Sequence, residues 1–115
     1  MVLVVEETST MFHDAMPVDW IEPGATAIVD VDGFPVAVAN VDGEFFAFQS
    51  LCPHQGTTLG GRPLQEGCII QCSQHSSRYD VTTGACVAPS SDDGFRQDLM
   101  TFPTRVVDGV VQIDV

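Results

Sequence analysis

Two short stretches of the chain each combine a cysteine with a histidine. Cys52 and His54 stand two positions apart, with a proline between them, and Cys72 and His75 stand three positions apart. Thiolates and imidazoles bind zinc and iron–sulfur clusters, and four such ligands complete one centre. Because the chain has only three histidines, chance is a poor explanation for this pattern. The sequence therefore predicts a metal centre held by two loops, each supplying one thiolate and one imidazole.

Two kinds of metal centre compete for these four ligands. Zinc accepts two cysteines and two histidines, but zinc modules mostly pair like with like, as Cys-x2-Cys and His-x3-His. Here each loop carries one residue of each type, which favours a dinuclear cluster with one iron bound by both cysteines and the other by both histidines. A third interpretation has no metal, with the cysteines buried as small hydrophobic residues. The mixed loops favour the iron–sulfur cluster.

Short strands joined by tight turns must position these loops. Alternating apolar residues predict strands over residues 25–31, 34–41, 44–50, 68–72, 77–81, 104–107 and 110–115. Three Asp-Gly pairs separate such runs, at positions 32–33, 42–43 and 108–109, and they are strong hairpin signals because glycine accepts the positive φ of the turn. Residues 16–23 are predicted to form a short turn of helix, and residues 90–100 a surface loop. We expect one all-β domain over residues 1–115, a small sandwich or barrel of antiparallel strands.

The composition limits the partners. The net charge is −12, lysine is absent, and residues 1–61 contain nine acids and no base. Nucleic acids and anionic membranes are therefore poor partners, whereas a protein with a basic docking face is compatible with this charge. The N-terminus lacks the basic leading region of a signal peptide, and no apolar run is long enough to span a membrane. We expect a cytoplasmic protein, in which cysteines bind metal rather than form disulfides.

The two loops carry a family resemblance. "CPHQG…L…G" followed by C-x2-H-x-S-x-Y-D…TG resembles the Rieske-type 2Fe–2S ferredoxins, which are soluble electron carriers of bacterial oxygenase systems. The resemblance runs from about Gly24 to the C-terminus and implies a Rieske-like fold with two cluster-binding loops at one tip. It implies that Cys52 and Cys72 bind the inner iron, and that His54 and His75 bind the outer iron near solvent. It also places Gln55 and Ser76 beside the ligands and Pro89 in a loop that covers the cluster.

The same resemblance bears on the reduction potential. Thr57 and Gln74 stand where high-potential relatives carry an extra pair of disulfide-forming cysteines, which favours the ferredoxin class. Ser77 and Tyr79 stand where hydroxyl groups of high-potential relatives donate to a bridging sulfide and to a cysteine sulfur. Such donors stabilise the reduced cluster. We expect a potential in the lower half of the Rieske range of roughly −150 to +300 mV, but above that of relatives without these hydroxyls.

The resemblance implies an electron carrier with no catalytic reaction of its own. It would take one electron from a flavin-containing ferredoxin reductase and deliver it to a terminal oxygenase, either a ring-hydroxylating dioxygenase of aromatic hydrocarbon catabolism or a related monooxygenase. Two alternatives remain, a Rieske subunit permanently bound in a larger oxidoreductase and a structural Cys2His2 zinc module. Ser76 departs from the family, because most relatives have glycine there. Buried thiols are expected at Cys68 and Cys86, and salt bridges rather than docking contacts at Arg62 and Arg78.

Overall fold

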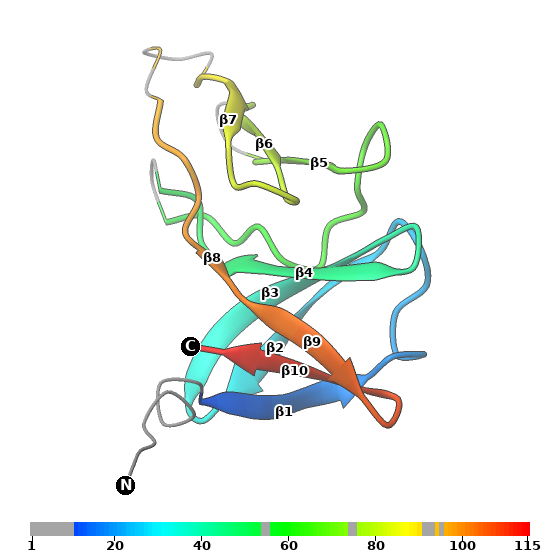
Figure 1. Ribbon diagram of the computed structural model, residues 1–115. Coiled ribbons are helices and arrows are strands. Elements are labelled where there is room, and N and C mark those ends of the chain that lie inside the picture. The colour runs from blue at the N-terminus through cyan, green and yellow to red at the C-terminus, as the bar shows by residue number, and fades with distance from the viewer. Residues whose placement is uncertain (1–10, 54–55, 74–75, 91–93, 95) are drawn as a thin grey trace, which may run out of the picture.

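The fold consists of short antiparallel strands. The computed structural model describes residues 11–53, 56–73, 76–90, 94 and 96–115 (Figure 1). Within these residues the strands are β1 (Phe12–Pro17), β2 (Thr26–Val31), β3 (Phe34–Val41), β4 (Glu44–Gln49), β5 (Ile69–Gln71), β6 (Arg78–Asp80), β7 (Cys86–Ala88), β8 (Thr101–Phe102), β9 (Thr104–Val107) and β10 (Val110–Asp114). The expectation of an all-β protein is confirmed. Among the described residues no helix is long and apolar enough to cross a membrane.

The strands form three sheets. One has the order β1-β10-β9, the second β2-β3-β4-β8, and the third β5-β6-β7. Figure 1 shows β1, β9 and β10 on one side of β3 and β4, and the small β5-β6-β7 sheet on the other side. The first and last strands of the chain, β1 and β10, are paired antiparallel. We call the first two sheets together the base, and the third sheet lies on one side of it.

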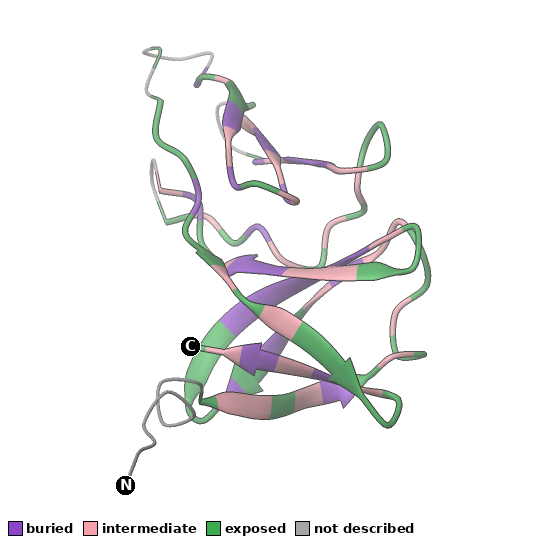
Figure 2. Cartoon of the chain, viewed as in Figure 1, coloured by how far each residue is buried: buried purple, intermediate pink, exposed green. Residues whose placement is uncertain are grey.

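Strand β3 is buried on both faces and contributes to two cores (Figure 2). Val36 and Val38 pack with residues of β1, β2 and β10 in the core of the base. Ala37 and Ala39 face the other way and pack with Cys52, Cys72 and residues of the small sheet. Alternate side chains of a strand point to opposite faces, so one strand can serve both cores. The small alanines leave room for the chain that carries the first cysteine.

The three predicted hairpin turns are present. Asp32-Gly33, Asp42-Gly43 and Asp108-Gly109 join β2 to β3, β3 to β4 and β9 to β10, and all six residues have positive φ, between 52° and 95°. Two successive positive φ values define the type I′ turn, whose twist matches that of the flanking strands. The hairpins of the base were therefore predictable from local sequence.

The predicted helical turn over residues 16–23 is wrong. Met16 and Pro17 end strand β1, and the residues that follow form turns before β2. Met16 pairs with Val111 and Pro17 with Val110 across 90 or more residues of chain. Proline is tolerated there because β1 is an edge strand of its sheet. The strand depends on a distant partner, which local periodicity does not reveal.

Candidate metal centre

The two cysteine-containing loops close in the same way. The backbone N–H of Cys52 donates to the carbonyl oxygen of Thr57 at 2.7 Å, and the N–H of Cys72 donates to the carbonyl oxygen of Ser77 at 2.8 Å. Each cysteine is thus bonded to the residue five positions later. We call the stretches 52–57 and 72–77 the first and second loops. Because the closing hydrogen bond is the same, the two cysteines have equivalent positions at the start of the two loops.

The two loops also share a backbone conformation just before they close. Gly56 has a φ of +73° in the first loop, and Ser76 has a φ of +61° in the second. A side chain at positive φ is strained, whereas glycine is not. The departure from glycine at Ser76 therefore has a conformational cost. The sequence marked this position only as a departure from the family's glycine, and the structure shows that its backbone is left-handed.

Exchanging glycine and serine between these two positions is expected to have opposite effects. Ser76→Gly removes the strain and should raise the stability by about 1 kcal/mol, which is about 4 °C in thermal midpoint for a chain of this size. Gly56→Ser should lower it by a similar amount through backbone strain, because no described residue lies within 4 Å of an added Cβ at Gly56. Far-UV circular dichroism of both variants measures the midpoints. A destabilised Ser76→Gly protein would show that the serine side chain makes a stabilising contact that outweighs its strain.

Both predicted cysteine ligands are buried in one core. Cys52 and Cys72 are 2% and 3% exposed, and they share this core with Tyr79 and Cys86. None of the four cysteines forms a disulfide, so no disulfide competes for the thiols. The structure thus brings together the thiols of the two loops. The predicted ligands His54 and His75, and with them Gln55 and Gln74, lie outside the described residues.

A tyrosine hydroxyl reaches the first thiol. The Oη of Tyr79 lies 3.4 Å from the Sγ of Cys52, and the tyrosine is fully buried. Burial raises the pKa of the Tyr79 phenol above its ordinary value, and the contact with Cys52 raises it further. The phenol therefore keeps its proton at neutral pH. Because a thiolate only accepts hydrogen bonds, the hydroxyl is the donor whenever Cys52 is ionised.

A second hydroxyl in the site, that of Ser77, has no acceptor in hydrogen-bonding geometry among the described residues. Ser77 is 1% exposed, and among the described residues nothing meets its Oγ in hydrogen-bonding geometry. The hydroxyl is close enough to Tyr79 to oppose the rise of the phenol's pKa. A buried hydroxyl without a partner costs free energy, so a bound group that offers an acceptor would stabilise this site.

These features fit an iron–sulfur cluster. Two buried thiols, one hydroxyl donor at a thiol and one unpaired hydroxyl provide the soft ligands and the hydrogen-bond donors that such a cluster needs. A zinc site would offer these hydroxyls only the two thiolate sulfurs as acceptors, whereas a cluster adds bridging sulfides. The donor set therefore favours the cluster over zinc.

Other residues singled out by the sequence have structural roles or lie at the surface. Pro89, predicted in a covering loop, is exposed and directly follows β7. Burial raises the pKa of the Cys68 thiol, and so does the Asp80 carboxylate that accepts its hydrogen bond. Cys86 is buried, with its Sγ 3.5 Å from the carbonyl oxygen of Ala88. The prediction of buried thiols is confirmed for Cys86, whereas Cys68 is partly exposed.

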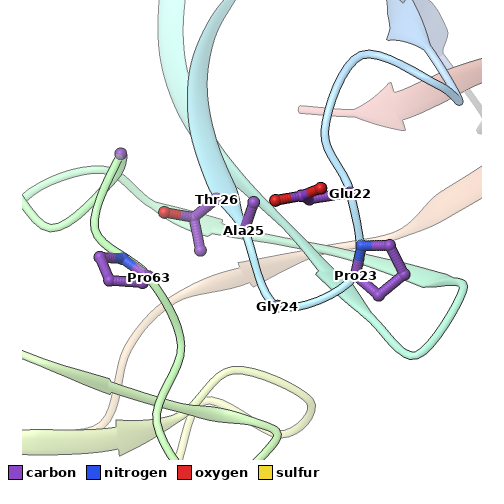
Figure 3. A pocket seen from close by; sticks show the side chains of 7 residues that line it. Glu22, Pro23, Gly24, Ala25, Thr26 and Pro63 are labelled. Carbon is purple, nitrogen blue, oxygen red and sulfur yellow. The ribbon is translucent and has the colours of Figure 1, made fainter.

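A shallow hollow lies elsewhere, beside the chain that leads into β2. It has a volume of about 240 Å³, and its lining includes Glu22, Gly24, Thr26 and Pro63 (Figure 3). Leu64 donates its N–H to the carbonyl oxygen of Gly24 at 2.9 Å, so the hollow sits at a structural joint. Among the described residues, neither Cys52 nor Cys72 lines it.

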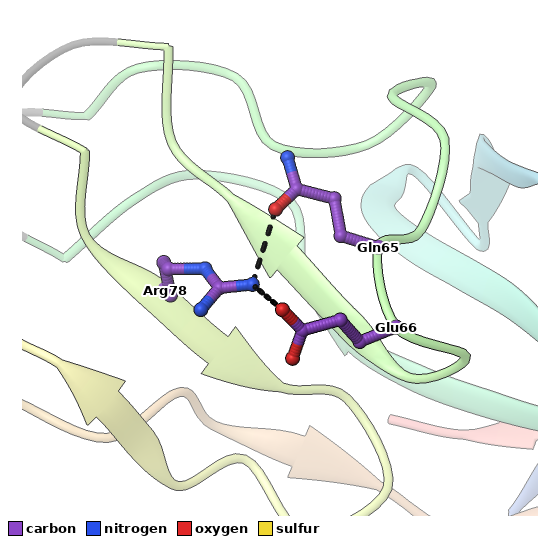
Figure 4. Close-up of polar contacts among 3 residues, drawn as sticks. All are labelled: Gln65, Glu66 and Arg78. Carbon is purple, nitrogen blue, oxygen red and sulfur yellow. Dashed lines mark hydrogen bonds and ion pairs between the residues drawn. The ribbon is translucent and has the colours of Figure 1, made fainter.

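Both arginines near the loops have intramolecular partners. Arg78 Nη2 lies 3.0 Å from Glu66 Oε2 and 3.2 Å from Gln65 Oε1 (Figure 4). Arg62 donates from Nε to the carbonyl oxygen of Gln71 at 3.0 Å. The prediction of a salt bridge is confirmed for Arg78, and Arg62 instead supports the strand that precedes Cys72.

Three polar residues that the sequence did not single out hold the backbone near the thiols. Gln49 donates from Nε2 to the carbonyl oxygen of Leu51 at 2.8 Å and accepts the N–H of Met100 at 2.7 Å. Arg96 and Asp98 bind the backbone of Cys86. The bonds of Arg96 and Asp98 to Cys86 and of Met100 to Gln49 join residues ten or more positions apart, so no local sequence pattern predicts them.

Comparisons with known proteins agree with this site. The family model described as "Rieske [2Fe-2S] domain" matches residues 11–103. The biphenyl dioxygenase ferredoxin subunit of Pseudomonas sp. (strain KKS102) is 34% identical over 103 residues, covering 90% of this chain and 91% of that protein. The Sphingomonas yanoikuyae B1 ferredoxin has a TM-score of 0.76 at 30% identity, covering 91% of this chain and 99% of that one.

The fold also recurs in a larger assembly. A chain of the reduced complex between oxygenase and ferredoxin in carbazole 1,9a-dioxygenase matches with a TM-score of 0.78 at 20% identity, over 91% of this chain and 28% of that one. The family match decides between the two metals in favour of the iron–sulfur cluster. This chain belongs to the Rieske [2Fe-2S] domain family and, within it, to the ferredoxin components of multicomponent oxygenase systems, which transfer electrons and catalyse no substrate reaction.

Proposed function

We propose that Cys52 and Cys72 bind the inner iron of the 2Fe–2S cluster, and that His54 and His75 bind the outer iron. Support comes from the two buried thiols, which stand at the start of two loops that are closed by the same type of backbone hydrogen bond. In the sequence, each histidine follows the cysteine of the same loop. With two thiolates instead of four, the oxidised cluster is neutral, so it supplies one-electron chemistry at a higher potential than an all-cysteine cluster.

The hydroxyl groups of the chain adjust that potential. Tyr79 is held protonated by burial and donates to the Cys52 thiolate. We propose that Ser77, whose hydroxyl has no partner among the described residues, donates to a bridging sulfide. Because both donors stabilise added negative charge on sulfur, they raise the reduction potential. Without the disulfide of the high-potential class, we place the potential in the lower half of the Rieske range.

In the proposed role, this domain accepts one electron from a flavin-containing ferredoxin reductase and passes it to a terminal oxygenase. The observation that carries the proposal is the match to a dioxygenase ferredoxin subunit over 91% of that protein's length. By the same relation, the oxygenase would be a ring-hydroxylating dioxygenase of aromatic compounds or a related monooxygenase. The four cysteines of this domain form no disulfide, which suits the reducing cytoplasm, and we infer that the protein acts in that compartment.

Reconstituted turnover tests this role. Purified reductase and oxygenase of a biphenyl dioxygenase system, supplied with NADH and biphenyl, should form product at a rate that rises with added ferredoxin and saturates. Size-exclusion chromatography should show a separable carrier. Product formation that does not depend on the added protein, although its cluster is reduced by the reductase, would contradict delivery to this oxygenase class. Co-purification in a fixed ratio with a larger oxidoreductase would contradict the shuttle and favour a permanently bound subunit.

A further inference from the structure

The outer edge of the small sheet is closed by two side chains. Strand β7 is an edge strand in the order β5-β6-β7, and Cys86 is its first residue. The N–H of Cys86 donates to Asp98 Oδ1 at 2.8 Å, and its carbonyl oxygen accepts from Arg96 Nη1 at 2.6 Å. A neighbouring strand would satisfy both groups from its main chain. Here the side chains of Arg96 and Asp98, which stand two residues apart, satisfy both groups. They therefore take the place of a neighbouring strand at Cys86 alone.

The bonds of Arg96 and Asp98 to Cys86 also affect the residue that faces Cys86 on β6. Cys86 is paired with Tyr79 on β6, and both lie in the buried core that contains Cys52. The N–H and carbonyl groups of Cys86 are bonded away from β6, which makes Tyr79 and Cys86 a non-hydrogen-bonded pair, the type in which facing side chains lie closest. The position of Cys86 therefore constrains the packing of the Tyr79 ring.

The segment that contains Arg96 and Asp98 is also linked to the backbone next to Cys52, at the other end of the Tyr79–Cys52 contact. Leu99, next to Asp98, donates its N–H to the carbonyl oxygen of Gly84 at 2.7 Å. Met100 then donates to the Gln49 side chain, which in turn binds the carbonyl oxygen of Leu51, the residue before Cys52. The segment 96–100 is thus bonded to β7 on one side and to the start of the first loop on the other.

Little movement is available at the Gly84 anchor. A Cβ added at Gly84 would lie 2.6 Å from the carbonyl oxygen of Leu99 and 2.9 Å from Thr101 Cγ2. The close approach indicates that the segment 96–100 lies directly on the turn between β6 and β7. The Oη of Tyr79 on β6 lies 3.4 Å from the Sγ of Cys52 in the first loop. The segment 96–100 is bonded near both of these residues and so holds them in place relative to one another.

We propose that Arg96 and Asp98 are positioning residues for electron transfer. By closing the edge of β7 at Cys86, they hold the Tyr79 hydroxyl at the Cys52 sulfur and so help to set the midpoint potential. The inference rests on the proposed ligation by Cys52, and it adds a determinant of potential that does not touch the cluster ligands.

Two substitutions at position 98 with equal charge test the proposal. Asp98→Asn keeps an oxygen acceptor for the N–H of Cys86, whereas Asp98→Ala removes it. Both lose the same negative charge, so a long-range electrostatic effect on the potential is shared. Redox titration of the cluster-loaded full chain should give a lower midpoint for Asp98→Ala than for Asp98→Asn. With Tyr79→Phe in the background, the difference between the two variants should disappear.

The outcomes separate positioning from stability alone. Thermal unfolding and iron content of each variant show whether the fold and the cluster are retained. If Asp98→Ala is less stable but has the midpoint of Asp98→Asn, the proposal is overturned. It is also overturned if the difference persists undiminished with Tyr79→Phe. The Cys52→Ser variant tests the proposed ligation separately. If Cys52 is not a ligand, this variant keeps the wild-type cluster signal.

Discussion

Serine in place of Cys72 is expected to abolish cluster binding. Cys72 is 3% exposed at the start of the second loop, and an alcohol at this position stays protonated where a thiolate is required. The purified variant should contain little iron and acid-labile sulfide and should lack the visible absorbance of the wild type. Cys52→Ser should have the same effect, because neither loop alone supplies enough ligands.

Cys68→Ser provides the matched control for this loss. Cys68 lies four residues before Cys72 and, like it, forms no disulfide. Its thiol interacts with the Asp80 carboxylate, and a serine hydroxyl can replace that interaction. This variant should keep its full cluster content. If the Cys72→Ser protein keeps its iron, or if Cys68→Ser loses as much, the assignment of ligands is wrong.

Removal of the two buried hydroxyls is expected to lower the reduction potential. Tyr79→Phe and Ser77→Ala each delete a donor that stabilises the more negative, reduced state while leaving the carbon framework in place. A difference of about 1–2 kcal/mol between the two redox states corresponds to about 40–90 mV for one electron. Redox titration monitored by circular dichroism in the visible range measures each midpoint.

Two further observations make this result informative. Because burial raises the pKa of Tyr79, its effect should be the same across the neutral pH range. The Arg105→Ala variant serves as a control, since Arg105 binds Gln112 and stacks on Phe12 in the base, away from the thiols. Midpoints unchanged by both hydroxyl substitutions would show that the donors do not act on the cluster.

The sequence predicted the features that depend on neighbouring residues. Alternating apolar residues and Asp-Gly pairs located the hairpins of the base, because turn conformation is determined by the residues of the turn itself. Strand β1 was missed, since it exists only by pairing with β10 at the other end of the chain. Strand β8 has two residues and one neighbour, which is too little for any periodic pattern.

The site was predictable to a similar degree. Cysteine and histidine are distinctive residue types, so their spacing predicted two ligand loops, and the structure places the thiols of both loops in one core. The conformation of Ser76 could only be suspected from the missing glycine, and the structure shows its positive φ. The contacts of Arg96 and Asp98 with the backbone of Cys86 were not predictable, because any polar residue of suitable length could make them.

The most direct test of the central claim is the detection of histidine nitrogen at the reduced cluster. Protein labelled with 15N-histidine, reduced and frozen, is measured by pulsed electron paramagnetic resonance. We predict hyperfine couplings from two histidine nitrogens, unchanged in His13→Ala and altered in His54→Ala and His75→Ala. A colourless, zinc-containing protein, or a cluster signal with no histidine coupling, would contradict the account.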